Sequence, residues 1–268
     1  MLAEAKLKWS TPDGDHLIAE MARVSSPQNQ DNVETEARLI NYLMRHRHWS
    51  PFEMVSMCIE IETTRDIGRQ ILRHRSFSFQ EFSGRYAEYD DLNTNRDMRM
   101  QDHKNRQNSI AADDESLLLS WKDEVGEVAE HARARYKWAL GRGVAKECAR
   151  ALLPEGLVPT RMYMTGTVRS WIHYISERTA PGVQLEHREL ARRIEVIFAE
   201  TFPNTYAATQ LPTPEQARIS ELTSMLVRCQ SQFAFYEQQH LAKCTQDGND
   251  KAAVNASFVA EIGELLGK

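Results

Sequence analysis

The chain changes from strand-like to helix-like and back to extended sequence within residues 54–86, MVSMCIEIETTRDIGRQILRHRSFSFQEFSGRY. Apolar and polar residues alternate from Met54 to Thr63, which predicts a strand with one buried face. Apolar residues then recur four positions apart, so Arg65 to Arg75 is predicted to form a helix. The alternation that returns from Phe77 to Tyr86 predicts an extended segment. Strand-like and helical segments are therefore mixed along this chain.

The second half of this stretch concentrates groups that bind anions. Residues 69–86 contain four arginines, a histidine and a glutamate, and no lysine occurs between Lys8 and Lys104. A guanidinium fork pairs with two phosphate oxygens at once, a geometry that a merely solvated surface does not require. A solvent-exposed basic helix face explains the spacing equally well, but the interleaved phenylalanines favour a binding site. The predicted ligand is polar and contains phosphate.

The predicted local structure gathers these groups in two sets. Residues Gln70 to His74 lie within one helical turn and can converge on one ligand. Glu81, Ser83 and Arg85 share one side of the chain if the segment is extended. The arginines on both sides of His74 disfavour its positive form, which leaves a neutral ring able to stack or to form hydrogen bonds.

Arg73-His74-Arg75, followed after seven residues by Ser83, resembles the defining motif of the flavin-dependent thymidylate synthases. Four further segments resemble conserved blocks of that family and occur in the same order. Together the segments cover residues 15–205, so the resemblance extends over most of the chain. The four segments are Ala22–Ser25, His46–Glu53, Ala149–Pro154 and Arg169–Arg178.

This resemblance implies an α+β fold with a central, mostly antiparallel sheet flanked by helices. It implies reductive methylation of dUMP to dTMP, with 5,10-methylenetetrahydrofolate as the one-carbon donor. FAD reduced by NADPH would donate the hydride. The implied partners are these small molecules, and the implied assembly is a homotetramer with active sites between subunits. An interface site is physically sensible, because FAD and dUMP together need more arginines than one short segment supplies.

For the substrate, the resemblance implies that arginines and Ser83 hold the phosphate of dUMP. Arg178 matches the arginine that faces the pyrimidine, where a fixed cation stabilises negative charge on the ring; it is the implied catalytic residue. Without the resemblance, Arg178 is a basic residue that complements a helix dipole, and Ser83 as a nucleophile would lack an activating base. Arg150 would come from a neighbouring subunit. The full implied dUMP set is Gln70, Ile71, Leu72, Arg73, Glu81, Phe82, Ser83, Gly84, Arg85, Arg150 and Arg178.

The resemblance implies a second set of residues for FAD. No Gly-x-Gly-x-x-Gly follows a predicted strand, so a Rossmann site is not supported, and side chains must hold the cofactor's phosphates. The matching positions are Ser25, His48, Ser50, Glu53, Arg73, His74, Arg75, Glu81, Thr167, Arg169 and His173.

A metal site is not expected, because His46 and His48 have no third histidine or cysteine nearby to complete a ligand set. The chain also departs from the family pattern at three positions. Thr167 and His173 stand where family members often have asparagine, and Gly182 stands where some have histidine. The first two departures concern contacts with the flavin, and the third concerns a contact with either the isoalloxazine ring or the folate.

Composition agrees with one enzyme in the cytoplasm. The 268 residues are 41% hydrophobic and 26% charged, which is ordinary for a globular protein. A net charge of −5 argues against a general nucleic-acid binder. No long apolar run or leader is present, so neither a membrane span nor secretion is expected. The four cysteines have no metal or disulfide spacing and are predicted to be reduced.

The predicted organisation is one catalytic domain over residues 1–205 and a helical C-terminal extension of unknown role over 206–268. Residues 88–115 are polar and without periodicity, which predicts a long surface loop. The other predicted helices cover residues 34–47, 117–140, 146–153, 165–177, 184–202, 214–243 and 252–266.

Two functions from other classes remain open at this point. A module that binds nucleotides or RNA through residues 73–85 would bind without a flavin and show strong salt dependence. A catalytically silent homologue would bind flavin without turnover. Against the silent homologue, every charged position matched to dUMP is present.

Overall fold

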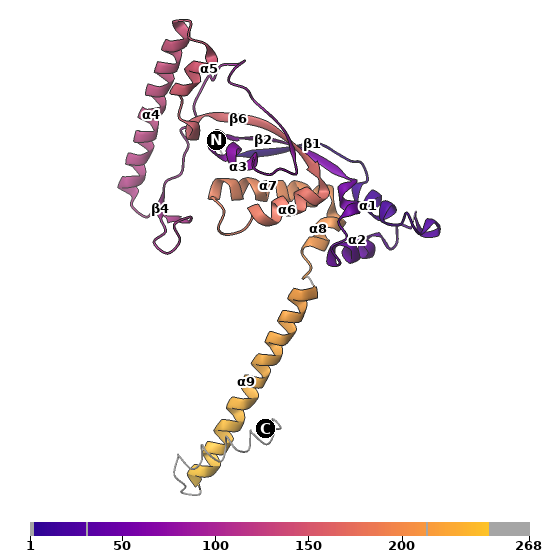
Figure 1. The fold of residues 1–268 in the computed structure, drawn as a ribbon. Coiled ribbons are helices and arrows are strands. Elements are labelled where there is room, and N and C mark those ends of the chain that lie inside the picture. The colour runs from indigo at the N-terminus through magenta and orange to yellow at the C-terminus, as the bar shows by residue number, and fades with distance from the viewer. Residues whose placement is uncertain (1–2, 31, 213, 247–268) are drawn as a thin grey trace. The chain divides into compact units, whose positions relative to one another are not determined.

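A computed structural model describes residues 3–30, 32–212 and 214–246. The chain divides into two compact units, Met1–Gln210 and Leu211–Lys268. The first unit has the predicted α+β architecture, with an antiparallel sheet flanked by helices (Figure 1). Among the described residues, no helix is long and apolar enough to cross a membrane.

The central sheet has four strands in the order β1-β2-β6-β3, and every neighbouring pair is antiparallel. In the middle of the sheet, Ile59 of β2 lies opposite Leu7 of β1 on one side and Met164 of β6 on the other. The strands are β1 (Glu4–Ser10), β2 (Ser56–Thr64), β6 (Pro159–Thr167) and β3 (Ser78–Glu81).

One face of the sheet is the hydrophobic core. Met57, Ile59 and Ile61 are fully buried, as the alternation in β2 predicts. Helices α6 (Val168–Arg178) and α7 (Leu185–Thr201) cover this face (Figure 1). Trp171 of α6 is fully buried there, and its indole N–H donates to the carbonyl of Met57 at 3.0 Å. The contact fixes α6, and with it Arg178 at the helix end, against the sheet.

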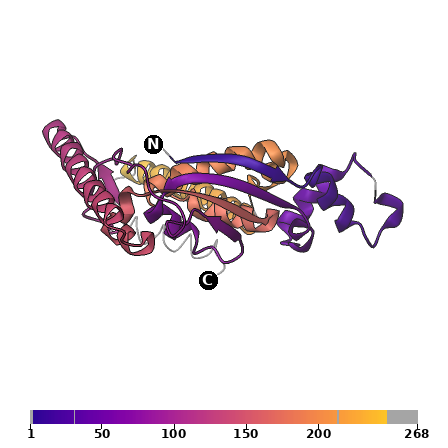
Figure 2. The ribbon, with the colours of Figure 1, turned by 90° about the horizontal axis from the view of Figure 1, so that it is seen from above.

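Apart from the short helix α3 (Arg65–Ile71), the remaining α-helices of the first unit lie at the two ends of the sheet (Figures 1 and 2). A second apolar cluster at one end joins Tyr89 and Leu92 to the buried face of the long helix, which includes Tyr136. That end holds α4 (Glu115–Gly141) and α5 (Lys146–Ala149), and the other holds α1 (Gly14–Ala22), α2 (Glu36–Arg45) and α8 (Pro203–Thr209).

The second unit contains one long helix, α9 (Pro214–Gln246), where the sequence predicts a helix over 214–243. Ile219, Leu222 and Leu226 are exposed along it. The second helix predicted for the extension, over 252–266, lies outside the described residues.

Three sequence predictions around the motif are wrong in detail. The helix predicted over Arg65 to Arg75 ends at Ile71, so α3 is Arg65–Ile71 and the Arg-His-Arg motif lies in the turn that follows. The extended segment stops at Glu81, because the backbone N–H of Tyr86 bonds back to the carbonyl of Ser83 in a turn. The side chains of Glu81, Ser83 and Arg85 therefore do not share a strand face.

Two other elements differ from the prediction. Residues 159–167 form β6, an interior strand that the sequence analysis missed by starting a helix near Thr165. The predicted loop over 88–115 contains a small hairpin of β4 (Arg99–Gln101) and β5 (Ser109–Ala111), and Tyr89 and Leu92 are buried. This segment is ordered by its own hairpin and by apolar side chains that join a core.

Candidate functional site

The turn after α3 and the end of α6 meet at two predicted site residues. The Nε–H of Arg178 donates to Nε2 of His74 at 2.7 Å, although 104 positions separate the two residues in sequence. The ring of His74 also packs edge-on against Tyr174 of α6, with centroids 4.9 Å apart. These contacts hold the guanidinium of Arg178 in one orientation beside the Arg-His-Arg turn.

The contact defines the protonation of His74. Burial lowers the pKa of His74, and the charges of Arg178 and Arg73 lower it further. Because Nε2 accepts a hydrogen bond from Arg178, the single proton of the neutral ring is on Nδ1. The neutral ring predicted from the flanking arginines is confirmed in direction, but burial is the first cause.

A second group of site residues surrounds the turn after β3. Glu81 accepts a hydrogen bond from the hydroxyl of Thr160 at 2.8 Å. A Cβ on Gly84 would lie 2.5 Å from the ring of Tyr89, so only glycine fits between this ring and the turn. Arg85 pairs with Glu147 of α5 at 3.1 Å, and its side chain is 61% exposed. The turn therefore presents a backbone free of side-chain bulk beside an accessible guanidinium.

A third group joins the 3-10 turn Ser50–Glu53 to α6. Glu53 and Arg169 form an ion pair, and the guanidinium of Arg169 lies 5.9 Å from the ring centre of Trp49. The rings of Trp49 and His173 are 5.1 Å apart. This arrangement makes an exposed surface with a paired charge and two flat rings. His48 lies in a ring cluster with Tyr42 and His46 on the adjoining segment.

Other predicted residues have no side-chain partner among the described residues. Arg73 and Arg75 are exposed, and neither side chain forms a hydrogen bond or an ion pair with another described residue. The side chains of Ser25 and Ser50 are likewise exposed and form no hydrogen bond with the three groups described above. Two free guanidinium groups beside His74 are available for an anionic ligand.

Arg150 lies apart from Arg178, in a pocket of about 390 Å³ that also has Arg65 and Arg69 in its wall. The side chain of Arg150 donates to the carbonyl of Glu147 at 3.3 Å, and Arg69 pairs with Glu155 at 2.7 Å. The three arginines outnumber the carboxylates of Glu147 and Glu155 in the same wall, which favours a negatively charged ligand.

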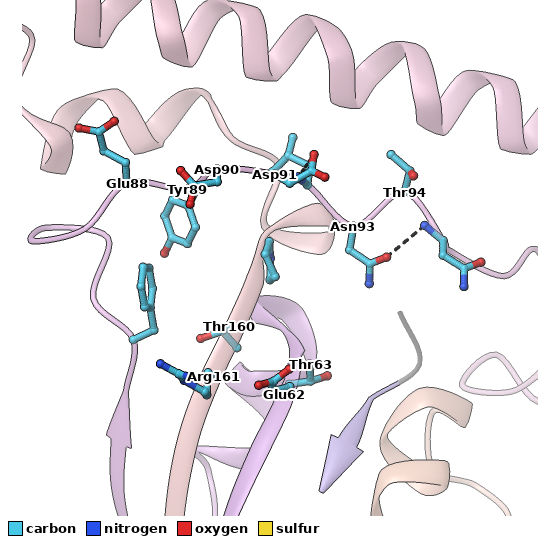
Figure 3. Close-up of a pocket in the computed structure, with 14 residues that line it drawn as sticks. Glu62, Thr63, Glu88, Tyr89, Asp90, Asp91, Asn93, Thr94, Thr160 and Arg161 are labelled. Atoms are coloured by element: carbon cyan, nitrogen blue, oxygen red, sulfur yellow. Dashed lines mark hydrogen bonds between the residues drawn. The ribbon is translucent and has the colours of Figure 1, made fainter.

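A larger pocket of about 550 Å³ lies beyond Tyr89, whose side chain borders both cavities. Figure 3 shows its wall, with the segment from Glu88 to Thr94 passing over the ends of β2 and β6. Four carboxylates and Arg161 give it a different electrostatic character from the arginine pocket. The carboxylates belong to Glu62, Glu88, Asp90 and Asp91.

The structure adds residues that sequence reasoning did not assign to the site. Tyr174 and His187 are buried directly behind His74, and the Tyr174 hydroxyl lies 3.1 Å from Nε2 of His187. Nδ1 of His187 lies 3.3 Å from the amide oxygen of Gln70, a predicted site residue. The only sequence signal was a histidine on the buried face of a predicted helix, which ordinarily indicates a core position. Among the described residues, no group of histidine, cysteine or acidic side chains could hold a metal ion.

His187 makes stability depend on pH. Burial, with the charges of Arg178 and His74, lowers the pKa of His187 to about 3. A folded-state pKa below the unfolded value stabilises the protein above that value, and the stabilisation is lost as pH falls from about 6.5 towards 3. Unfolding free energies of the wild type and His187→Asn, measured from pH 7 to 5, should diverge with a slope approaching about 1.4 kcal/mol per pH unit. Parallel curves would contradict the burial of a neutral ring.

Comparisons with known proteins agree with this geometry. Residues 6–204 match the family model described as "Thymidylate synthase complementing protein". The chain is 50% identical over 203 residues to the flavin-dependent thymidylate synthase of Synechocystis, covering 75% of this chain and 90% of that protein. It is 47% identical over 190 residues to a probable flavin-dependent thymidylate synthase of Paramecium bursaria Chlorella virus 1, covering 71% and 88%.

A comparison with solved structures also finds proteins of similar fold. The UMP/dUMP methylase PolB from Streptomyces cacaoi, bound with 5-Br dUMP, is 28% identical with a TM-score of 0.67, covering 77% of this chain and 93% of PolB. The α+β fold of this chain is thus shared with a solved UMP/dUMP methylase. The chain belongs to the flavin-dependent thymidylate synthase family.

Proposed function

We propose that this protein is a flavin-dependent thymidylate synthase, which methylates dUMP at C5 and reduces the transferred carbon to a methyl group. The observation that carries the proposal is the contact of Arg178 with His74, which fixes a cation beside the Arg-His-Arg turn. As C5 of the pyrimidine becomes nucleophilic, negative charge develops on the ring, and a fixed guanidinium stabilises it. Because His74 is neutral, it holds Arg178 without cancelling the positive charge of the guanidinium.

The phosphate of dUMP is assigned to the turn after β3. Ser83 and Arg85 supply a hydroxyl and a guanidinium, and Gly84 leaves the backbone open to close approach. Gln70 and Glu81 flank this turn and would contact the nucleoside. PolB, a family relative in fold, is described as bound with 5-Br dUMP and with 5-Br UMP, which supports a uridine nucleotide as the ligand class.

The residues present fit FAD. The exposed, unpaired guanidinium groups of Arg73 and Arg75 suit a pyrophosphate, and the surface of Trp49, Arg169 and His173 offers flat groups for a ring system. When bound, FAD would supply the hydride chemistry that side chains lack. Thr167 caps α6 by accepting from the backbone N–H of Ser170 at 3.3 Å, so its hydroxyl has a structural partner before any ligand binds.

The remaining parts of the proposal are NADPH as the reductant, 5,10-methylenetetrahydrofolate as the carbon donor, and a homotetramer with shared sites. The separation of Arg150 from Arg178 into different groups supports the shared site. A group that lies in another pocket of its own chain can still complete the site of a neighbouring chain. A cytoplasmic location also remains a prediction; Cys58, Cys148 and Cys229 are free thiols.

Mixed variants test the shared site. Arg178→Ala and Arg150→Ala chains, each expressed alone, should be nearly inactive because every site lacks one of its arginines. If Arg178 and Arg150 of one site come from different chains, random co-assembly leaves about a quarter of the sites with both arginines. Co-expressed and co-purified chains should therefore regain about a quarter of wild-type activity. A mixture no more active than either variant would contradict the shared site.

The proposed function is tested by the visible spectrum of the purified protein. A flavin band should be present or appear on adding FAD, and NADPH should bleach it under anaerobic conditions in the presence of dUMP. A colourless protein that takes up no FAD would overturn the proposal. In that case, tight binding of an oligonucleotide would favour the nucleic-acid module. Flavin binding without turnover is a different outcome and would favour the silent homologue.

A further inference from the structure

The amide of Gln70 is held by one protein side chain on each side. Its oxygen lies 3.3 Å from Nδ1 of His187, and its NH₂ group donates to the amide oxygen of Gln184 at 2.7 Å. Gln184 in turn donates to a carboxylate oxygen of Glu186 at 3.1 Å. A side-chain amide has donors at one end and acceptors at the other, so its orientation depends on what these neighbours supply.

Glu186 decides the direction of this chain of hydrogen bonds. Both of its oxygens accept from the Nη2 of Arg99, at 2.8 and 2.9 Å. Burial acts to raise the pKa of Glu186, but the hydrogen bonds from Arg99, from its own backbone N–H and from Gln184, with the charge of Arg99, outweigh burial and leave the pKa below its usual value. An ionised carboxylate only accepts hydrogen bonds. Gln184 must therefore turn its NH₂ group to Glu186 and its oxygen to Gln70.

The orientation of Gln184 determines the direction of the remaining hydrogen bonds. Because Gln184 presents an oxygen, Gln70 presents its NH₂ group to Gln184 and its own oxygen to His187. His187 must then carry its proton on Nδ1, and Nε2 accepts from the Tyr174 hydroxyl at 3.1 Å. His187 is fully buried, which favours the neutral ring that this arrangement requires. In every hydrogen bond from Tyr174 to Glu186, the donor thus lies on the Tyr174 side and the acceptor on the Glu186 side.

We propose that His187 and Glu186 are positioning residues that fix the orientation of the Gln70 amide for dUMP. The inference rests on the proposed function, which assigns Gln70 to the nucleotide site. Two of the four hydrogen-bonding positions of the amide are used inside the protein, so one N–H and one lone pair are left for the ligand. An amide that is already oriented loses less conformational freedom when the nucleotide binds.

This arrangement also gives a role to the hairpin in residues 88–115. Arg99 is the first residue of β4, and its guanidinium reaches α7 to hold Glu186. The side chains of Arg99 and Glu186 are only 17% and 21% exposed, so the pair is shielded from solvent. The hairpin therefore anchors Glu186, the last acceptor in the series of hydrogen bonds that orients Gln70.

The experiment measures dUMP affinity in a double-mutant cycle between His187 and Gln70. His187→Leu removes both hydrogen bonds of the ring and should weaken dUMP binding about tenfold, or about 1.4 kcal/mol. In a Gln70→Ala background the same change should have no further effect, because no amide is left to orient. His187→Asn keeps a donor near the position of Nδ1 and should restore most of the affinity. FAD affinity and thermal stability, measured in parallel, separate this effect from general damage.

An equal loss of dUMP affinity in both backgrounds, or no loss in either, would overturn the inference. If His187→Leu does not fold, Glu186→Gln carries the same test, since it keeps the size of the side chain and removes the acceptor-only group. That variant should weaken dUMP binding several-fold only when Gln70 is present. A wild-type protein that binds no dUMP would overturn the proposed function itself, and with it the assignment of Gln70 as a ligand.

Discussion

Replacing Arg178 with alanine should lower the rate of thymidylate formation by at least about a hundredfold at saturating dUMP. The guanidinium is fixed by the hydrogen bond from its Nε to His74 and by the packing of α6 on the sheet. A cation that is already in place needs no reorganisation when charge develops on the pyrimidine, so its loss acts mainly on the chemical step. The measurement is kcat with FAD occupancy verified from the absorption spectrum.

Two matched variants test whether the rate depends on the exact position of the Arg178 charge or only on the presence of a positive charge. Arg178→Lys keeps the positive charge but loses the fork that bonds His74, so its rate should fall between those of the wild type and the alanine variant. Arg192→Ala removes the same charge from an exposed position on α7 and should leave the rate within about twofold, as surface changes usually do. A nearly unchanged rate in Arg178→Ala would contradict the role given to this residue.

The second large effect concerns the phosphate. Arg85→Ala should weaken dUMP binding by about 10- to 100-fold, because a hydrogen bond between charged partners contributes about 1.5–3 kcal/mol. The side chain is exposed and pairs with Glu147 at the surface, so it can exchange this partner for a phosphate without unfolding the turn. Equilibrium titration of the FAD-loaded protein with dUMP measures this loss.

Deoxyuridine, which has no phosphate, is the control ligand for this prediction. The wild type and Arg85→Ala should bind it equally weakly, since the missing guanidinium has no phosphate to contact. Glu147→Gln removes the carboxylate that competes for Arg85, and this variant should bind dUMP at least as tightly as the wild type. A parallel loss of affinity for dUMP and deoxyuridine in Arg85→Ala would show that Arg85 does not contact the phosphate.

Local sequence patterns predict much of the fold but not all of the sheet. The alternation from Met54 to Thr63 identifies β2, because its buried residues are isoleucine and methionine and its other face is mainly polar. Strand β6 was missed. Its buried Met162 and Met164 alternate in the same way, but methionine is also common in helices, and the strand continues directly into α6.

The site was predictable where a motif is contiguous and was not where folding creates a contact. The arginines near His74 were visible as a group, yet the bond from Arg178 to His74 depends on how α6 packs on the sheet. His187 resembles an ordinary core position in the sequence, and only its neighbours show that it faces Gln70. The ligand roles of these residues remain predictions, since the described contacts are all within the protein.

The central claim is that this protein converts dUMP to dTMP with a flavin. The most direct measurement supplies anaerobic protein with FAD, dUMP, NADPH and 5,10-methylenetetrahydrofolate that is isotopically labelled in its methylene carbon. The account predicts labelled dTMP, formed only when FAD is present and strongly reduced in Arg178→Ala. A protein that binds both FAD and dUMP yet transfers no label to the nucleotide would contradict it.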